Sequence, residues 1–420
     1  MTQTETIPAG YKKTEIGIIP EDWSLFNIDE IADVLSGKRI PKGKSLTKNA
    51  TAYPYITVSD MKSGSINLEN IKFIPEDVYP FIKNYRIFID DIYISVAGTL
   101  GLVGTIPKQL NGANLTENAN RLTNIKCDKR FLLYLLLSPL IQNKIDEVKT
   151  LGAQPKLALT RIRKFNVMLP QSKSEQKVIA EVLSDTDALI ECLEKLIAKK
   201  KAIKQGAMQQ LLTGKKRLPG FTGEWENMKL GRLVDYKNGK SFESHIVDNG
   251  DYYLITLNSL DINGKLRKEH LRVAFNDKSL NKNDLIMILS DVAHGYFLGL
   301  TDVIPEDNKY VLNQRVGALK NIRYVAPYYL SKYINIRQKY FKSIGQGSSQ
   351  QNLNRDDILN FKVCFPTEKS EQLAITYMIL DMDAEIEKLE QKRDKYISIK
   401  QGMMQQLLTG KIRLIKNGDN

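Results

Sequence analysis

The chain contains the same segment twice. Residues 204–218 read KQGAMQQLLTGKKRL and residues 400–414 read KQGMMQQLLTGKIRL, so thirteen of fifteen positions are identical at an offset of 196. Self-similarity at a fixed distance constrains the architecture before any single residue is interpreted. Because the period has the size of a domain, it predicts a duplicated module and not a solenoid.

The similarity reaches both ends of each module. A Lys-Ser-Glu-Gln segment recurs at 173–176 and 369–372, and the pattern W-x4-[IL]-x2-[IL]-x-D-x3-G-K begins at Trp23 and again at Trp225. The middles of the modules are much less alike. Two similar frames around two divergent interiors suggest one mechanical role that is performed twice on two different targets.

Each module is predicted to consist of a globular part and a long helix. Short β-rich runs separated by turn residues, with one helical stretch after them, fill residues 23–165 and 225–361. The second part carries apolar residues at alternating steps of four and three, which is typical of a coiled-coil seam. The seam positions are Ile179, Leu183, Thr186, Ile190, Leu193, Ile197, Lys200 and Lys204, and then Ile379, Met382, Ile386, Leu389, Arg393 and Tyr396.

A seam this narrow needs a partner helix, and the nearest candidate is the other copy. Duplicated modules tend to pack about a pseudo-two-fold axis, which would make two rods of roughly 45 Å antiparallel. The alternative is that each rod packs on its own globular part. We predict the α+β class: two similar mixed α/β domains separated by two long antiparallel coiled-coil helices. The predicted boundaries are 1–168, 169–218, 219–364 and 365–420.

The linker segment is continuous in the middle of the chain, and its second copy is divided between the two ends of the chain. Residues 219–225 join the first helix to Trp225, whereas the equivalent lead-in to Trp23 stands near the start of the chain, and the second helix is followed by only a few residues. This organisation is circular, and it predicts that the two ends of the chain meet.

Composition narrows the class of protein. The net charge of +13, from 61 basic and 48 acidic residues, favours a polyanionic partner. The three cysteines lack metal-ligand spacing, and neither a signal region nor an apolar run long enough to span a bilayer is found, so we expect a cytoplasmic protein. No phosphate-binding loop, dinucleotide fingerprint, methyltransferase motif or catalytic triad is present. We therefore expect no enzyme activity, no cofactor and no metal.

The opening, entry and closing motifs together resemble those of the specificity subunit of type I restriction-modification systems, across residues 15–416. The resemblance implies two target-recognition domains that each read one half of a split DNA sequence, with the helices as a ruler between them. It also implies docking of two methyltransferase subunits and of restriction subunits, to which S-adenosylmethionine and ATP belong.

We expect the DNA-binding residues to be pseudo-symmetric pairs of polar or basic side chains in loops. They are Lys38, Arg39, Thr57, Ser59, Asn120, Arg121, Gln154 and Lys156, and in the second module Lys240, Ser241, Thr256, Asn258, Gln314, Arg315, Gln350 and Asn352. The turns before Leu157 and Leu353 are the strongest candidates. Two other functions stay open on the residues alone: a coiled-coil adaptor without nucleic acid, and a self-contained methyltransferase or nuclease with unrecognised motifs.

Overall fold

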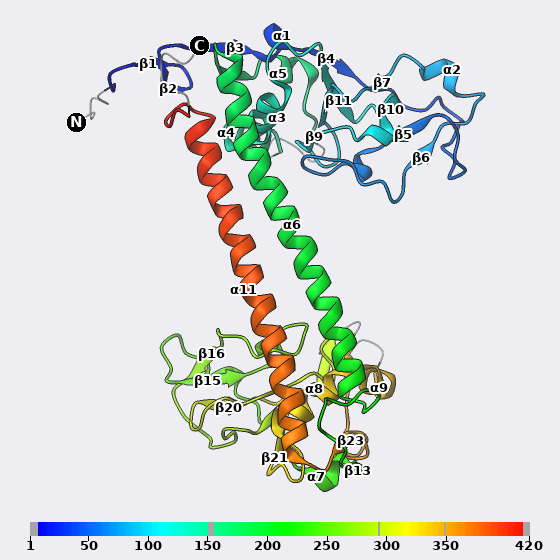
Figure 1. The fold of residues 1–420 in the computed structure, drawn as a ribbon, viewed down its shortest axis with the longest axis vertical. Coiled ribbons are helices and arrows are strands. Elements are labelled where there is room, and N and C mark those ends of the chain that lie inside the picture. The colour runs from blue at the N-terminus through cyan, green and yellow to red at the C-terminus, as the bar shows by residue number, and fades with distance from the viewer. Residues whose placement is uncertain (1–6, 150–154, 293–294, 348–349, 415–420) are drawn as a thin grey trace. The chain divides into compact units, whose positions relative to one another are not determined.

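The chain divides into two compact units, each with its own globular domain (Figure 1). The computed structural model describes residues 7–149, 155–292, 295–347 and 350–414. Unit 1 comprises residues 1–192 and 392–420, and unit 2 comprises residues 193–391. Two helices of 39 residues, α6 (Lys173–Leu211) and α11 (Lys369–Leu407), each contribute one end to unit 1 and the other to unit 2.

The domain of unit 1 is built on two four-stranded sheets. The first sheet has the order β4-β11-β8-β9 (Asp33–Ser36, Ala119–Thr123, Ile92–Ser95, Val103–Thr105). The second has the order β6-β5-β10-β7 (Lys72–Phe73, Pro54–Ile56, Ala113–Leu115, Arg86–Ile87). Two-stranded pairs are formed by β3 with β12 (Trp23–Asn27, Asn166–Pro170) and by β1 with β2 (Tyr11–Thr14, Gly17–Pro20). The short helices are α1 (Ile28–Ile31), α2 (Tyr79–Ile82) and α5 (Leu159–Arg163).

The domain of unit 2 repeats this plan. Its sheets have the orders β14-β21-β17-β19 (Asp235–Asn238, Val316–Lys320, Leu285–Ile288, Thr301–Val303) and β16-β15-β20 (Leu271–Val273, Tyr252–Ile255, Tyr310–Leu312). Pairs are formed by β13 with β23 (Trp225–Lys229, Lys362–Pro366) and by β18 with β22 (Ser290–Val292, Gln350–Asn352). The short helices are α7 (Leu230–Leu233) and α10 (Arg355–Leu359).

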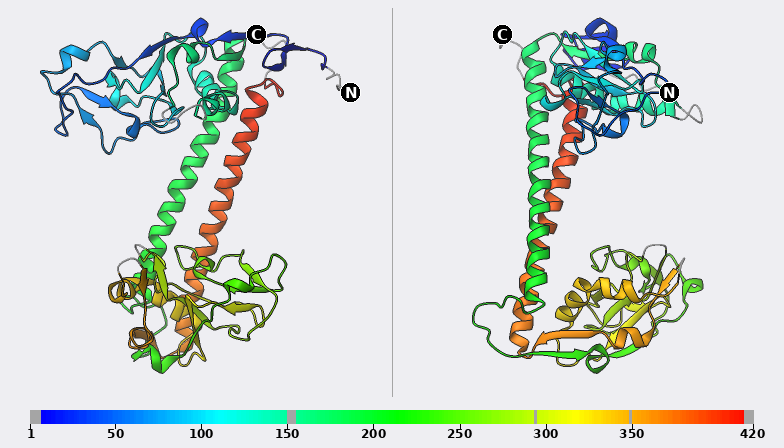
Figure 2. Two further views of the ribbon diagram at one scale, coloured as in Figure 1. Left: turned by 180° about the vertical axis from the view of Figure 1, so that it is seen from behind. Right: turned by 90° about the vertical axis from the view of Figure 1, so that its right-hand side faces the viewer.

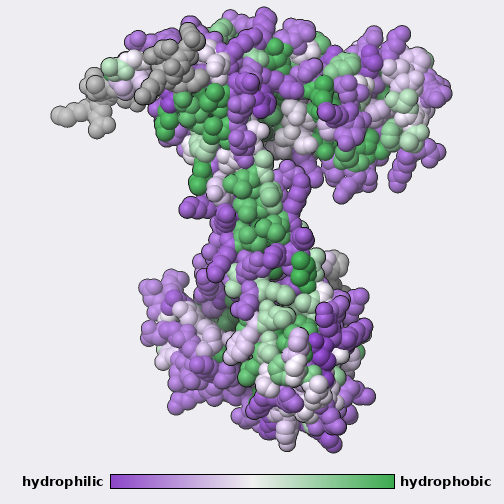
Figure 3. Space-filling view, in the orientation of Figure 1, coloured by the Kyte–Doolittle hydropathy of each residue, from purple (hydrophilic) through white to green (hydrophobic). Residues whose placement is uncertain are grey.

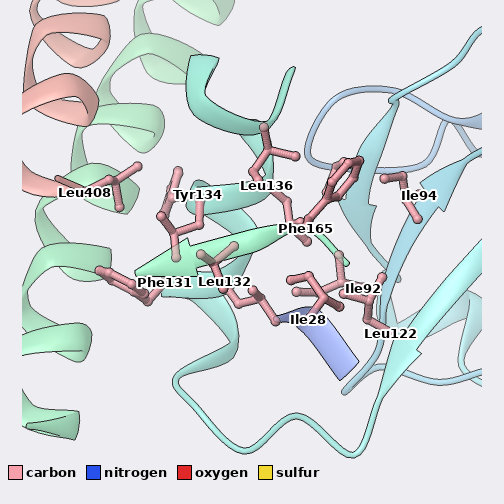
Figure 4. Packing of buried hydrophobic residues seen from close by; sticks show 14 of the residues in the cluster. Ile28, Ile92, Ile94, Leu122, Phe131, Leu132, Tyr134, Leu136, Phe165 and Leu408 are labelled. Atoms are coloured by element: carbon pink, nitrogen blue, oxygen red, sulfur yellow. The ribbon is translucent and has the colours of Figure 1, made fainter. Parts of the chain in front are cut away.

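The helical stretch predicted in each domain is two helices and not one. In unit 1, α3 (Lys129–Leu137) and α4 (Pro139–Lys149) are separated by Ser138, whose extended backbone is the conformation favoured before a proline. In unit 2, α8 (Pro327–Ile336) and α9 (Gln338–Ile344) are separated by Arg337. Figure 4 shows Phe131 and Leu132 of α3 in the main core of unit 1, which also includes Leu408, just beyond α11.

The two long helices pair with each other, and the pairing is antiparallel. In unit 2, Lys204 bonds Asp383, and the Nζ atom of Lys200 lies 2.6 Å from Oε1 of Glu385, so rising numbers in α6 meet falling numbers in α11. In unit 1, Nζ of Lys400 lies 2.6 Å from Oδ1 of Asp187. This pair is the repeat equivalent of Lys204 with Asp383. The views in Figures 1 and 2 show the helices side by side within each unit.

The predicted seam is confirmed, because every seam position is buried or partly buried. The alternative is also partly correct: Ile179 and Leu183 of α6 belong to the core of unit 1, and Ile375 and Ile379 of α11 to the core of unit 2. Although glycine disfavours helix, Gly206 and its repeat equivalent Gly402 do not interrupt the long helices, which continue past both residues.

Described segments near the two ends of the chain meet within unit 1, as predicted. The guanidinium of Arg413 bonds both carboxylate oxygens of Glu175, at 2.5 and 2.9 Å, and both of Asp22, at 2.9 and 2.8 Å. The Tyr11 hydroxyl donates to the Gly410 carbonyl at 3.0 Å. The bonds to Arg413 lower the pKa of the Asp22 carboxyl.

Unit 2 makes the corresponding closure within the continuous chain. Arg217 donates two bonds, of 2.5 and 2.6 Å, to the carboxylate of Glu371. Glu371 is fully buried, and its counterpart Glu175 is only 2% exposed. Each long helix is therefore followed by an arginine that binds a buried carboxylate in the first turn of the other. Among the described residues, no helix is long and apolar enough to cross a membrane.

Candidate nucleic-acid interface

Four candidate segments of unit 1 meet, and backbone hydrogen bonds hold them together. The amide of Lys38 donates to the carbonyl of Leu115 at 2.9 Å, and the amide of Thr116 donates to that of Ile56 at 3.1 Å. Val96 links the other two segments: its amide donates to the carbonyl of Asn118 at 2.7 Å, and its carbonyl accepts from the amide of Leu157 at 2.9 Å. The loops after β4, after β5, between β10 and β11, and before α5 are thereby joined. We call this junction, residues 37–39, 57–59, 116–118 and 155–157, cradle 1.

Unit 2 repeats the same four bonds. The amide of Lys240 donates to the carbonyl of Leu312 at 3.4 Å, and the amide of Asn313 donates to that of Ile255 at 3.1 Å. The amide of Leu289 donates to the carbonyl of Arg315 at 3.0 Å, and the carbonyl of Leu289 accepts from the amide of Leu353 at 2.8 Å. We call residues 239–241, 256–258, 313–315 and 350–353 cradle 2. Leu157 and Leu353, which follow the turns that were the strongest candidates, are buried.

A glycine in each cradle lets two loops approach closely. A Cβ atom on Gly37 would overlap the carbonyl oxygen of Thr116, and one on Gly239 would overlap that of Asn313. These are the glycines of the G-K step in the opening motif. Their role is close backbone approach, because neither adopts a positive φ.

Cradle 1 presents basic side chains beside one acid. Lys38, Arg39 and Lys156 are exposed. Nε of Arg39 donates to Oε1 of Glu117 at 2.5 Å. Thr57 begins a short 3-10 turn, and the Asp60 carboxylate accepts from its backbone amide at 2.8 Å and from its hydroxyl at 2.6 Å, while Ser59 is exposed beside it.

Cradle 2 is organised around Glu243. This carboxylate accepts from the side chains of Asn313 at 2.8 Å, Ser241 at 2.8 Å and Gln314 at 3.2 Å. These bonds, the one from Asn313 foremost, lower the pKa of Glu243 to about 2. Glu243 is therefore an anion at neutral pH and fixes the side chain of Gln314.

The remaining candidates of this unit lie on the rim or in a cavity. Lys240 and Asn258 are exposed, and Thr256 begins a 3-10 turn as Thr57 does in unit 1. A cavity of about 390 Å³ is lined by Leu289, Ser290, Gln314, Arg315, Gln350, Asn352 and Leu353. It brings together four candidates, two from the loop before β21 and two from strand β22, which are far apart in the sequence.

The predicted equivalence of Arg121 with Arg315 is wrong by three residues. Thr123 lies opposite Asp33 in unit 1 and Lys320 lies opposite Asp235 in unit 2, and the two aspartates are equivalent in the opening motif. Counting back along the strands, Arg315 corresponds to Asn118. Arg121 instead lies within strand β11, where its side chain is 15% exposed and its Nη1 is 3.5 Å from Asp91.

Asn120 is likewise removed from the cradle surface, because it is 2% exposed inside the same sheet. Gln154 lies outside the described residues. Sequence reasoning missed Glu117, Asn118, Ser290 and Glu243. No sequence pattern marks any of the four, and Glu117 and Asn118 are placed only by the strand register from Asp33 in the folded sheet.

Comparisons with known proteins agree on one family. The type I restriction modification DNA specificity domain matches residues 20–202 and again 222–397. The MjaX specificity subunit of a type I restriction enzyme from Methanocaldococcus jannaschii is 25% identical, over 96% of this chain and 97% of that protein. The MjaVIII specificity subunit of the same organism is 29% identical over 50% of this chain and 49% of its own length.

Solved structures share the fold. The S subunit of a type I restriction-modification system from M. genitalium superposes with a TM-score of 0.55 at 16% identity, over 92% of this chain and 96% of the other. A structure from work on complex assembly and conformational transition of the type I system gives 0.59 at 15% identity, over 94% and 99%. With two family domains that together fill most of its length, the chain belongs to the type I restriction-modification specificity family.

Proposed function

We propose that this chain gives a type I restriction-modification complex its DNA sequence specificity. Each cradle reads one half of a split target in double-stranded DNA. The observation that carries the proposal is the double set of four backbone bonds, which joins four equivalent segments in both domains. Rigid loops of this kind fix polar side chains in place, as the reading of base edges requires.

Charge supports a polyanionic ligand. Lys38 and Lys240 stand at equivalent exposed positions, where they suit phosphate oxygens, and the cradle amides and Arg315 suit base edges. Figure 3 shows hydrophilic side chains over much of the drawn face of each unit, with hydrophobic patches between them. No group of side chains able to hold a metal occurs among the described residues.

We further propose that the chain acts without catalysing a reaction and in the cytoplasm. On this view, two methyltransferase subunits dock on the helices, and restriction subunits join the complex. The recognition domains would be residues 1–168 and 219–364, with spacer regions 169–218 and 365–420. No observation favours an adaptor without nucleic acid or a self-contained enzyme.

Sequencing of methylated bases in the host tests the proposal. Deleting the gene should abolish methylation at one split motif, and restoring it should bring that motif back. A hybrid in which residues 30–165 are replaced by those of another family member should change one half of the motif and keep the other. An unchanged set of motifs after deletion would refute the proposal.

A further inference from the structure

Arg315 occupies the position in cradle 2 that most favours direct contact with a base. Its side chain is exposed and lines the 390 Å³ cavity. Within the described part of the chain it forms no ion pair, in contrast to Arg39 and Arg121, which bind Glu117 and Asp91. Its guanidinium is therefore available to a ligand without first breaking an internal bond.

The backbone under Arg315 is held on both sides. Its carbonyl accepts from the amide of Leu289 at 3.0 Å, and the amide of Val316 closes a turn onto Asn313 at 3.1 Å. The side chain of Asn313 is 97% buried and is fixed by Glu243. A base-reading side chain needs such a fixed origin, because a mobile one loses binding free energy when it is ordered.

Amide side chains form the facing wall of the cavity. Gln350 Nε2 donates to the Ser290 hydroxyl at 2.5 Å and approaches Oδ1 of Asn352 at 3.4 Å. Asn352 Nδ2 donates to the carbonyl of Gln350 at 3.3 Å. Ser290 is 5% exposed, so the wall has a buried support.

These side chains match two bases in the major groove. The planar fork of arginine donates two parallel bonds to O6 and N7 of guanine, and the amide of asparagine or glutamine pairs with N6 and N7 of adenine. Resting on the proposed function, we propose that Arg315 reads a guanine in the half-site of unit 2, and that Gln350 or Asn352 reads an adjacent adenine.

Cradle 1 has a different set of side chains at the equivalent places. By strand register, Asn118 stands where unit 2 has Arg315, and Glu117 where it has Gln314. Lys156 stands where unit 2 has Asn352, because the equivalent leucines Leu157 and Leu353 follow them. The proposal therefore concerns unit 2 alone, and the half-site of unit 1 has no arginine at this position to require a guanine.

Substitutions at Arg315 test the proposal in the complete complex, with methylation motifs as the measurement. Arg315→Lys keeps the charge but loses the fork. It should relax the preference at one guanine of the unit 2 half-site by about 5- to 150-fold, which is the discrimination of one bidentate contact. The other half-site and the gap should stay the same. Gln350→Ala together with Asn352→Ala should relax a neighbouring adenine position.

A matched control removes a charge elsewhere. Lys339→Asn, at an exposed position of α9, should leave the motif unchanged. If Arg315→Lys keeps the motif and Arg315→Asn only weakens DNA binding uniformly with a smaller salt dependence, Arg315 binds phosphate and the proposal is overturned. A wild-type unit 2 half-site without a fixed guanine also overturns it. Either result leaves the proposed function standing, because a split motif still depends on the gene.

Discussion

Equal insertions in both long helices should lengthen the gap between the half-sites, whereas an insertion in one helix should not be tolerated. The ion pairs fix the register: Asp187 meets Lys400 in unit 1, and Lys204 meets Asp383 in unit 2. Residues between these pairs, near Lys195 in α6 and Gln391 in α11, are the place to add length.

The magnitude follows from helix geometry. Seven added residues extend a helix by about 10 Å and restore the heptad phase, and about 10 Å corresponds to about three base pairs. If only α6 receives them, the partners in one unit are displaced by about 10 Å, since both ion pairs cannot then form. Matched insertions after Lys195 and after Gln391 keep both pairs in place.

The assay is the sequencing of methylated bases in cells that carry each variant. The matched variant should methylate the same half-sites with about three more undefined base pairs between them. The α6-only variant should lose methylation and unfold at a lower temperature. An active matched variant with an unchanged gap would refute the reasoning, because the spacing would then be set by something other than helix length.

Three further predictions concern stability and the cradles. Arg413→Ala leaves Glu175 buried without its guanidinium partner and should lower the free energy of unfolding by about 3 kcal/mol, measured by denaturant titration; a loss below about 1 kcal/mol would contradict the closure as described. Gly37→Ala should abolish recognition of the unit 1 half-site, and Gly239→Ala that of the unit 2 half-site, in methylation mapping; equal damage to both halves would contradict independent cradles. The pKa of Glu243 falls from 4.5 to about 2 on folding, so its contribution to stability is present at neutral pH and is lost between about pH 4.5 and 2. Glu243→Gln should therefore melt with less dependence on pH in that window, and an unchanged acid profile would argue against this role.

The repeated frame could be predicted from the sequence because its pattern is local. The seam, the closing segment and the opening motif each occur twice at a nearly constant offset, and each proved to be structurally equivalent in the two units. The divergent interiors contain no motif that recurs at a constant offset. There the sequence aligned Arg121 with Arg315, while the strand register aligns Asn118 with Arg315.

The side-chain partners within the cradles lay beyond prediction for a different reason. Glu243 reaches Asn313 across 70 residues, and Arg39 reaches Glu117 across 78. Contacts between loops so distant in sequence depend on the folded sheets and not on any local spacing. The end of the helix at Ser138 could have been predicted, because a proline follows it. The apolar pattern continues past Ser138, however, and favoured one uninterrupted helix.

The closure in unit 1 implies that a peptide link from the end of a long helix to the next opening motif is not essential to the fold of a unit. Asp22 is held to Arg413 by side-chain bonds alone, whereas the equivalent segment of unit 2 runs unbroken from Arg217 to Trp225. A circularly permuted gene, opened in that linker and joined through the present termini, would exchange which unit contains the break. The break could thus move from one module to the other, and all the bonds that join α6 to α11 would be retained.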